Sequence, residues 1–275
     1  MSESSAIERS GDLPPTVDSL SDDLSRLGIS RGSILLVHSS LSSLGWICGG
    51  AVAVIEALIR VIGPQGTLVM PTHTAGLSDP KNWSNPPVPR SWWTVIRENT
   101  PAFDGRTTPT RGMGAVAECF RNHSGVIRSH HPLVSFAALG PAANEITSEH
   151  ELENGLGDYS PLGRIYESGG GILLLGVGHS NNTSLHLAEV RAYGAKHPMT
   201  HAGAPMMVDG RRQWVEFNEP EYNDDDFPSI GLAFSQETGL VRSGPVGVAK
   251  SMLMPQAPLV DFGVEWFRRN GKGIG

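Results

Sequence analysis

The chain has 275 residues, of which 39% are hydrophobic and 18% are charged, and its formal net charge at pH 7 is −7. This length suits one large domain or two small ones with a sizeable core, and the composition is that of a soluble globular protein. The negative charge argues against a nucleic-acid partner, because such binding depends on a basic surface.

The ends and the cysteines indicate a cytoplasmic protein. No apolar run approaches the roughly 20 residues that a transmembrane helix needs, so no membrane span is expected. Residues 1–15 lack the basic and apolar regions of a signal peptide and are interpreted as a polar N-terminal lead-in. Cys48 and Cys119 lie far apart without CxxC spacing, which favours neither a disulfide framework nor a zinc site. Cys48 is expected to be a small buried thiol rather than a nucleophile.

The first elements predict a strand–helix–strand unit. Apolar residues at helical spacing predict a helix over residues 16–27 that ends at Gly28. The run GSILLVHSS predicts a buried strand with a turn at His38–Ser40, GGAVAVIEALIRVIG predicts a helix, and GTLVMPT predicts a second strand. This βαβ order predicts an α/β fold with parallel strands.

Residues 72–110 interrupt this pattern. They are rich in Pro, Trp, Asn and Ser and are too long for an ordinary connection. Trp83, Trp92 and Trp93 argue against disorder, because such side chains normally pack on a partner surface. We expect an ordered excursion that lines a pocket.

The rest of the chain returns to alternating elements. Helices are predicted for GMGAVAECFRN, SPLGRIYESGG and TSLHLAEVRAYG, and strands for VSFAALG and GILLLGVG. APMMVDG and RRQWVEF predict two strands joined by a hairpin at Asp209-Gly210, and helices are expected near 225–238 and 257–270. Because no linker and no repeat divides the chain, residues 1–275 are expected to form a single domain.

The most informative stretch is GVGHSNNTSLHLAE, which ends with His186 and Glu189. Side chains three residues apart on a helix share a face and can touch. A carboxylate bonded to one imidazole nitrogen fixes the tautomer and leaves the other nitrogen free as a base. The pair opens a helix after a strand, where α/β proteins bind ligands. The residues alone leave a catalytic base and a stabilising surface pair as equal alternatives.

Other reactive arrangements are less specific. His179 and His186 are seven residues apart without an HExxH pattern, and the SHHP run at 129–132 cannot be paired with them by spacing, so no metal site is predicted. Ser39 and Ser40 follow a strand without a GxSxG elbow. They suit phosphate or carbonyl recognition, or form an ordinary turn.

Two charged runs also keep two interpretations each. RTTPTRGMGAVAECFR places Arg, Thr and Gly before a helix, as in anion sites, but has neither a P-loop nor a dinucleotide pattern. NEPEYNDDDF is either a solvated loop at a helix start or an acidic wall for a polyamine substrate.

Together these stretches resemble the aminoglycoside 3-N-acetyltransferase family, antibiotic N-acetyltransferases that use acetyl-CoA. The resemblance extends from about Leu20 to Gly247, and the matching runs are LLVHSSLSSLG, GPQGTLVMPT, GMGAVAECFR, RSHHPLVSFAALGP, SPLGRIYE and ILLLGVGHSNNTSLHLAE. It implies αβα layers around a central mixed sheet, acetyl-CoA as co-substrate without a metal, and direct transfer in a ternary complex. The implied activity is acetylation of an aminoglycoside at the 3-N position, which confers resistance.

The resemblance also implies site residues. The family's catalytic His and Glu correspond to His186 and Glu189. The implied acetyl-CoA surface comprises Ser39, Ser40, Thr110, Arg111, Gly112, Met113, His131, Ser135, Val177 and Gly178. Asp79, Glu219 and Glu221 are the implied contacts of the cationic acceptor.

Residues 76–110 do not align with the family's aminoglycoside-binding residues, so other functions stay open. One alternative is an N-acetyltransferase for a biosynthetic amine, and another is a CoA-binding relative without transferase activity. A homodimer is a further open option.

Overall fold

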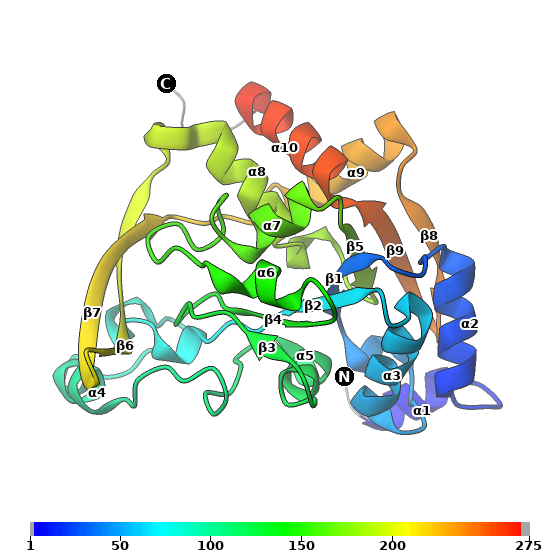
Figure 1. Ribbon diagram of the computed structural model, residues 1–275, viewed down its shortest axis with the longest axis horizontal. Helices are drawn as coiled ribbons and strands as arrows, with labels where there is room; N and C mark the ends of the chain where they lie inside the picture. The colour runs from blue at the N-terminus through cyan, green and yellow to red at the C-terminus, as the bar shows by residue number, and fades with distance from the viewer. Residues whose placement is uncertain (1–2, 271–275) are drawn as a thin grey trace.

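A seven-stranded mixed sheet forms the centre of the computed structural model, which describes residues 3–270 (Figure 1). β1 is parallel to β2 and to β5, and every other neighbouring pair is antiparallel. The predicted βαβ unit is therefore confirmed, with α3 (Gly50–Ile62) as its helix. The strands are, in spatial order, β3 (Ile127–Arg128), β4 (Phe136–Leu139), β2 (Thr67–Pro71), β1 (Ile34–Ser39), β5 (Gly171–Leu175), β9 (Ala249–Pro255) and β8 (Arg242–Val246).

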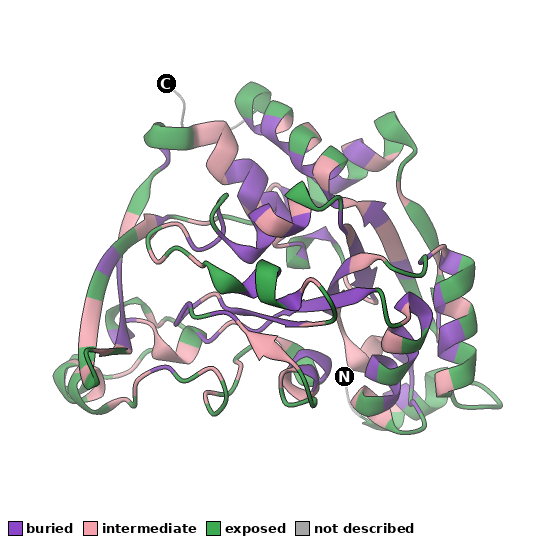
Figure 2. Ribbon diagram, in the orientation of Figure 1, coloured by how far each residue is buried: buried purple, intermediate pink, exposed green. Residues whose placement is uncertain are grey.

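Helices cover both faces of this sheet, because successive strand residues point to opposite sides. Leu35 and Val37 of β1 belong to an apolar cluster with α2 (Val17–Leu27), α3 and α5 (Gly114–Arg121). Leu36 points the other way, into a cluster with α6 (Ala143–Ser148), α7 (Pro161–Glu167), α8 (Ser184–Tyr193), α9 (Phe227–Thr238) and α10 (Gln256–Asn270). Figure 2 shows the central strands buried between these two layers. The αβα arrangement that the family resemblance implied is confirmed.

Local sequence signals explain the helix boundaries. Thr16 caps α2 in a reciprocal capping box with Ser19, and Gly28 ends the helix in the left-handed conformation with φ 107°. Ser160 caps α7, and Pro161 occupies its first turn, where the missing N–H costs nothing. The helix predicted at residues 16–27 is confirmed by α2.

A second, two-stranded sheet lies to one side of the main one (Figure 1). β6 (Met199–Val208) and β7 (Arg211–Pro220) are joined at Asp209-Gly210, where both residues have positive φ, as the predicted hairpin requires. The 72–110 excursion packs against this ribbon through α4 (Trp93–Asn99). The Phe103 N–H donates to the Pro205 carbonyl at 2.8 Å. The excursion is ordered, as expected.

The N-terminal lead-in contains a helix that the sequence analysis did not predict. α1 (Glu3–Arg9) packs on η1, the 3₁₀ turn at Leu41–Leu44. The Trp46 indole N–H donates to the Glu3 carboxylate at 3.1 Å, and the Trp46 backbone N–H donates to Ser10 Oγ at 2.7 Å. These bonds hold α1 against the body of the protein.

Cys48 is exposed, so the expected burial is wrong: it lies in the turn before α3, outside the helix face that packs on the sheet. No helix within residues 3–270 is long and apolar enough to cross a membrane. The other 3₁₀ turns are η2 (Ala75–Leu77), η3 (Pro80–Asn82), η4 (Arg90–Trp92), η5 (His179–Asn181) and η6 (Gly194–Lys196).

Candidate active site

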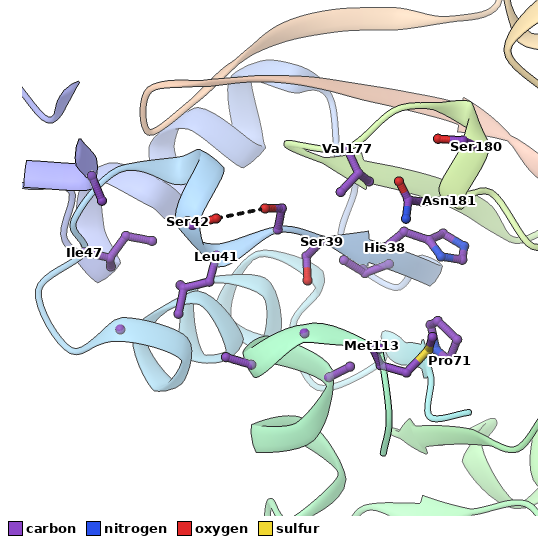
Figure 3. A pocket seen from close by; sticks show the side chains of 18 of the residues that line it. His38, Ser39, Leu41, Ser42, Ile47, Pro71, Met113, Val177, Ser180 and Asn181 are labelled. Atoms are coloured by element: carbon purple, nitrogen blue, oxygen red, sulfur yellow. Dashed lines mark hydrogen bonds between the residues drawn. The ribbon is translucent and has the colours of Figure 1, made fainter. Parts of the chain in front are cut away.

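A cavity of about 870 Å³ opens where the parallel strands β1, β2 and β5 end (Figure 3). The carboxyl edge of a parallel sheet is where open α/β folds bind ligands. Figure 3 shows His38 and Ser39 of β1 with Met113 and Pro71 on one side and Val177 and Asn181 on the other. The remaining wall includes residues 40–42, Trp46, Ile47, Gly112, Gly114, Ser180, Thr183, Phe227 and His186.

The sequence-predicted pair is formed, with His186 on the wall of this cavity and Glu189 behind it on a second, smaller cavity. His186 Nδ1 lies 3.0 Å from Glu189 Oε2, and the exposed fractions of the two side chains are 14% and 5%. Because an ionised carboxylate only accepts, Nδ1 carries the proton and Nε2 is left as a base. Tyr222 and Phe227 meet the His186 ring edge-on at centroid distances of 5.0 and 4.7 Å, which fixes the plane of the ring.

The second oxygen of Glu189 also has neighbours. The Asn223 backbone N–H donates to Glu189 Oε1 at 3.3 Å, and His197 Nε2 lies 4.0 Å from the same oxygen. The carboxylate is thus held from two sides inside a buried site. Such an arrangement can orient an imidazole and stabilise it after it accepts a proton.

His38 is a cavity residue that the sequence analysis missed. It is buried near the end of β1, and its Nε2 lies 3.4 Å from the Thr183 hydroxyl. Burial lowers its pKa to about 3, so the ring is neutral at physiological pH. Its position immediately before Ser39, in a strand predicted to end at a ligand-binding edge, was the signal that could have identified it.

Half of the residues implied for acetyl-CoA line the cavity, and they are Ser39, Ser40, Gly112, Met113 and Val177. Gly112 and Gly114 have φ of 79° and 82°, a conformation that favours glycine, and this turn brings Gly114 close to the Ser39 carbonyl. Gly178 lines a neighbouring cavity of about 460 Å³ that shares Val177 and includes Arg9 and Lys250.

Thr110 and Arg111 lie beside the cavity rather than on its wall. The Thr110 hydroxyl and backbone N–H donate to Glu118 Oε2 at 2.7 and 2.8 Å. The Arg111 guanidinium lies over the Trp83 ring at 5.9 Å. Both residues shape the turn that leads to Gly112, and direct contact with CoA stays a prediction.

His131 and Ser135 are buried behind the site. His131 Nδ1 accepts from the Leu133 and Val134 N–H groups, and its Nε2 donates to the Leu152 carbonyl. The Ser135 hydroxyl donates to the Thr72 carbonyl at 2.9 Å. These bonds organise loops around β4, and neither residue belongs to the cavity wall.

The three residues implied for the acceptor are not in one place. Asp79 is buried, with Arg97 donating to both carboxylate oxygens and Lys81 3.7 Å away. Burial disfavours its ionised form, but the bonds from Lys81 N–H and Arg97 outweigh this and hold its pKa below the usual value. This carboxylate is already paired, so its contact with an acceptor stays a prediction.

Glu219 is the penultimate residue of β7, and Glu221 follows directly after the strand ends at Pro220. Glu219 is half-buried, and burial raises its pKa to about 7. Glu221 lines a second cavity of about 230 Å³, together with Glu189 and His197. The acidic side that the sequence suggested is therefore adjacent to Glu189, whereas Asp79 belongs to the 72–110 excursion.

Two other expectations concern the Trp-rich excursion and metals. The expectation that residues 72–110 line the pocket is wrong for the 870 Å³ cavity, whose wall includes none of them. Trp83 and Trp93 instead lie under arginine side chains. His179 is buried against Gly231 rather than grouped with His186. Within residues 3–270, no set of three or more His, Cys, Asp or Glu side chains is arranged to hold a metal ion.

Known proteins are similar to this chain in sequence and in fold. The family model for aminoglycoside 3-N-acetyltransferases matches residues 36–268. The SPbeta prophage-derived aminoglycoside N(3')-acetyltransferase-like protein YokD of Bacillus subtilis is 46% identical over 96% of each chain. Its crystal structure superposes with a TM-score of 0.93, at 45% identity over 97% of this chain and 98% of that one.

More distant relatives agree. Aminoglycoside N(3)-acetyltransferase VII of Streptomyces paromomycinus is 35% identical over 97% of this chain and 96% of its own. The crystal structure of AAC-IIIb in a binary complex with CoASH superposes with a TM-score of 0.83, at 30% identity over 96% of this chain and 99% of that one. The family expected from the sequence is confirmed, and this chain belongs to the aminoglycoside 3-N-acetyltransferase family of acyltransferase enzymes.

Proposed function

We propose that this protein transfers the acetyl group of acetyl-CoA to the 3-N amino group of a cationic aminoglycoside and thereby confers resistance. The observation that carries the proposal is the 3.0 Å contact of Glu189 with His186, whose ring lines the 870 Å³ cavity. It combines an oriented base with a cavity in the usual size range for small-molecule sites, roughly 300–1,000 Å³.

The cavity wall suits the pantetheine arm of the donor. Ser39, Ser40 and the Gly112–Gly114 turn offer hydroxyl and backbone groups, while Met113 and Val177 offer apolar surface. Arg9 and Lys250, on the neighbouring cavity that shares Val177, supply positive charge for the phosphates. The relative AAC-IIIb, crystallised with CoASH, supports this donor.

Acidic residues next to Glu189 suit a cationic acceptor. Glu219 and Glu221 flank Pro220, the last residue of β7, and the whole chain carries a net charge of −7. Such a field attracts a polycation over a Debye length of about 8 Å at physiological salt. In this proposal, these two carboxylates hold ammonium groups of the acceptor while one amine faces His186.

His186 acts as the general base in the transfer. An aminoglycoside amine is largely protonated at neutral pH, and His186 Nε2 takes one proton from it, which frees the lone pair that attacks the thioester carbonyl. A C–N bond forms, the C–S bond breaks, and the departing thiolate takes up the second proton that the nitrogen loses. Backbone N–H groups of the Gly112–Gly114 turn stabilise the negative oxygen that develops. Glu189 keeps the ring in its reactive tautomer and stabilises the imidazolium.

The test is thiol release from acetyl-CoA with a panel of aminoglycosides and mass analysis of the products. We expect one acetyl group on one ring amine. Glu189→Gln should reduce turnover about 10–100-fold, because the amide oxygen can still accept from Nδ1 but no longer places a negative charge beside the imidazolium. The matched control is Glu216→Gln, which removes the carboxylate of an exposed His–Glu pair, 3.7 Å from His201.

The outcomes separate the alternatives. Thiol release without any acceptor would indicate a hydrolase. CoA binding without turnover would indicate a binding protein. Turnover with other amines but not with aminoglycosides would keep the donor chemistry and replace the acceptor.

A further inference from the structure

We propose that His197 is a positioning residue that holds Glu189 from the side opposite to His186. This inference rests on the proposed function, because it matters only if the His186–Glu189 pair does catalysis. His197 follows η6 and precedes β6, eight residues after Glu189 in the chain. It is not on the wall of the 870 Å³ cavity, so it acts through Glu189.

The ring of His197 is buried, yet one of its nitrogens is unpaired. Only 3% of the side chain is exposed, and Nε2 has no hydrogen-bond partner among the described residues. Buried polar atoms nearly always have a partner. The carboxylate facing this nitrogen is Glu189, with Oε1 4.0 Å away. This distance exceeds that of a hydrogen bond but is within the range of an ion pair.

The hydrogen bond of the other ring nitrogen, Nδ1, shows where one proton of His197 lies. Nδ1 lies 3.0 Å from the Pro198 carbonyl oxygen, which only accepts, so Nδ1 carries a proton. A neutral ring would then direct the Nε2 lone pair at the Glu189 carboxylate. An imidazolium instead directs an N–H at each oxygen. The geometry therefore points to a cationic His197 that faces Glu189.

The charges around His197 favour the same state. The ring and Glu189 border the 230 Å³ cavity, whose other carboxylates are Glu221, Asp225 and Asp226. The remaining groups on that cavity are neutral and include Tyr193 and Tyr222, and Tyr193 meets the His197 ring edge-on at 5.2 Å. Among residues 3–270, no lysine or arginine borders this cavity. A positive ring is thus the only cation that these described residues place on its wall.

The consequence is a row of three side chains, His186–Glu189–His197. Oε2 of Glu189 meets His186, while Oε1 meets the Asn223 N–H at 3.3 Å and faces His197 Nε2. Pinning Oε1 prevents the carboxylate from rotating away from His186. Loss of the His197 N–H should therefore lower kcat and leave KM for both substrates nearly unchanged.

The experiment compares His197→Leu with His197→Gln in the full-length enzyme. Leucine keeps apolar packing without a donor, whereas glutamine places an amide N–H close to the position of Nε2. We expect leucine to reduce kcat about tenfold, in line with the loss of an interaction with a charged group, and glutamine to restore most of it. His201→Gln is the matched control, because His201 forms an exposed pair with Glu216.

A kcat of His197→Leu within twofold of wild type would overturn the proposal, as would equal losses in the leucine and glutamine variants at unchanged melting temperature. If the variants fold poorly, ¹⁵N-histidine NMR of the wild-type protein decides the question. We expect protons on both nitrogens of His197, and an unprotonated Nε2 would overturn the proposal. The NMR result is independent of turnover. Full activity of His186→Ala would instead contradict the proposed function itself.

Discussion

Acidification to pH 5 should destabilise this protein through its buried histidines. Burial lowers the pKa of His38 to about 3, that of His131 to about 3 with a contribution from His150, and that of His150 to about 4. Each ring stays neutral in the folded protein at pH 5, while the unfolded chain binds protons below about 6.5. One and a half pH units at about 1.4 kcal/mol each give about 2 kcal/mol per histidine, or about 6 kcal/mol for the three.

Glu219 opposes this loss. Burial raises its pKa to about 7 from 4.5, so the folded state holds a proton that the unfolded state releases. Its contribution is present at low pH and is lost as the pH rises through 7. From pH 7 down to pH 5, Glu219 is protonated in the folded state but mostly ionised in the unfolded state. These two pH units, at about 1.4 kcal/mol each, give a contribution of about 3 kcal/mol at pH 5. Glu118, whose pKa is held at about 2 by Arg121 and Thr110 despite burial, changes little above pH 4.5.

Urea unfolding followed by the fluorescence of the six tryptophans measures the balance. Burial also lowers the pKa of His73 and His179, which adds to the loss on acidification. Between pH 7.5 and pH 5 we therefore expect the unfolding free energy of the wild type to fall by at least about 3 kcal/mol, and that of Glu219→Gln by at least about 6 kcal/mol. His201→Gln, at an exposed ring, should behave like the wild type. A wild-type stability that stays constant or rises on acidification would refute this reasoning, as would a Glu219→Gln variant with a shallower decline.

Three further predictions concern ligands and packing. Changing Glu219 and Glu221 together to their amides should raise the aminoglycoside KM and weaken its salt dependence, and an unchanged salt dependence would remove these residues from the acceptor side. Arg9→Ala or Lys250→Ala should weaken acetyl-CoA binding in calorimetry by about 1 kcal/mol or more without changing kcat, and equal affinity would contradict the phosphate assignment. Gly231→Ala should cost about 1–3 kcal/mol in urea unfolding, because the new Cβ would lie 2.1 Å from Cγ of His179. Wild-type stability of Gly231→Ala would show that η5 adapts freely.

Segments with regular apolar spacing and with clear cap or turn residues were predictable from the sequence. The helix at residues 16–27 has its apolar spacing, its cap and its terminal glycine in one short run, and the hairpin at Asp209-Gly210 requires the positive φ that both residues adopt. His186 and Glu189 were identified because spacing on a helix determines which side chains touch. In each case the determining interaction is local.

Features that depend on distant partners were not predictable. β8 and β9 contain Pro245 and Pro255, which resemble loop residues, and they form strands by pairing with each other and with β5. α1 is short and polar, and its bonds to Trp46 and η1 come from a segment some forty residues later. The pairing of Asp79 with Arg97 and the approach of His197 to Glu189 likewise depend on tertiary packing.

The most direct test of the central claim is the kcat of His186→Ala for acetyl transfer to an accepted aminoglycoside, measured beside its affinity for acetyl-CoA. His201→Ala serves as the matched control at an exposed histidine. We predict a loss of about 10²–10⁴-fold in kcat for His186→Ala, the usual contribution of a general base, with acetyl-CoA affinity retained. A His186→Ala enzyme that turns over at the wild-type rate would contradict the account.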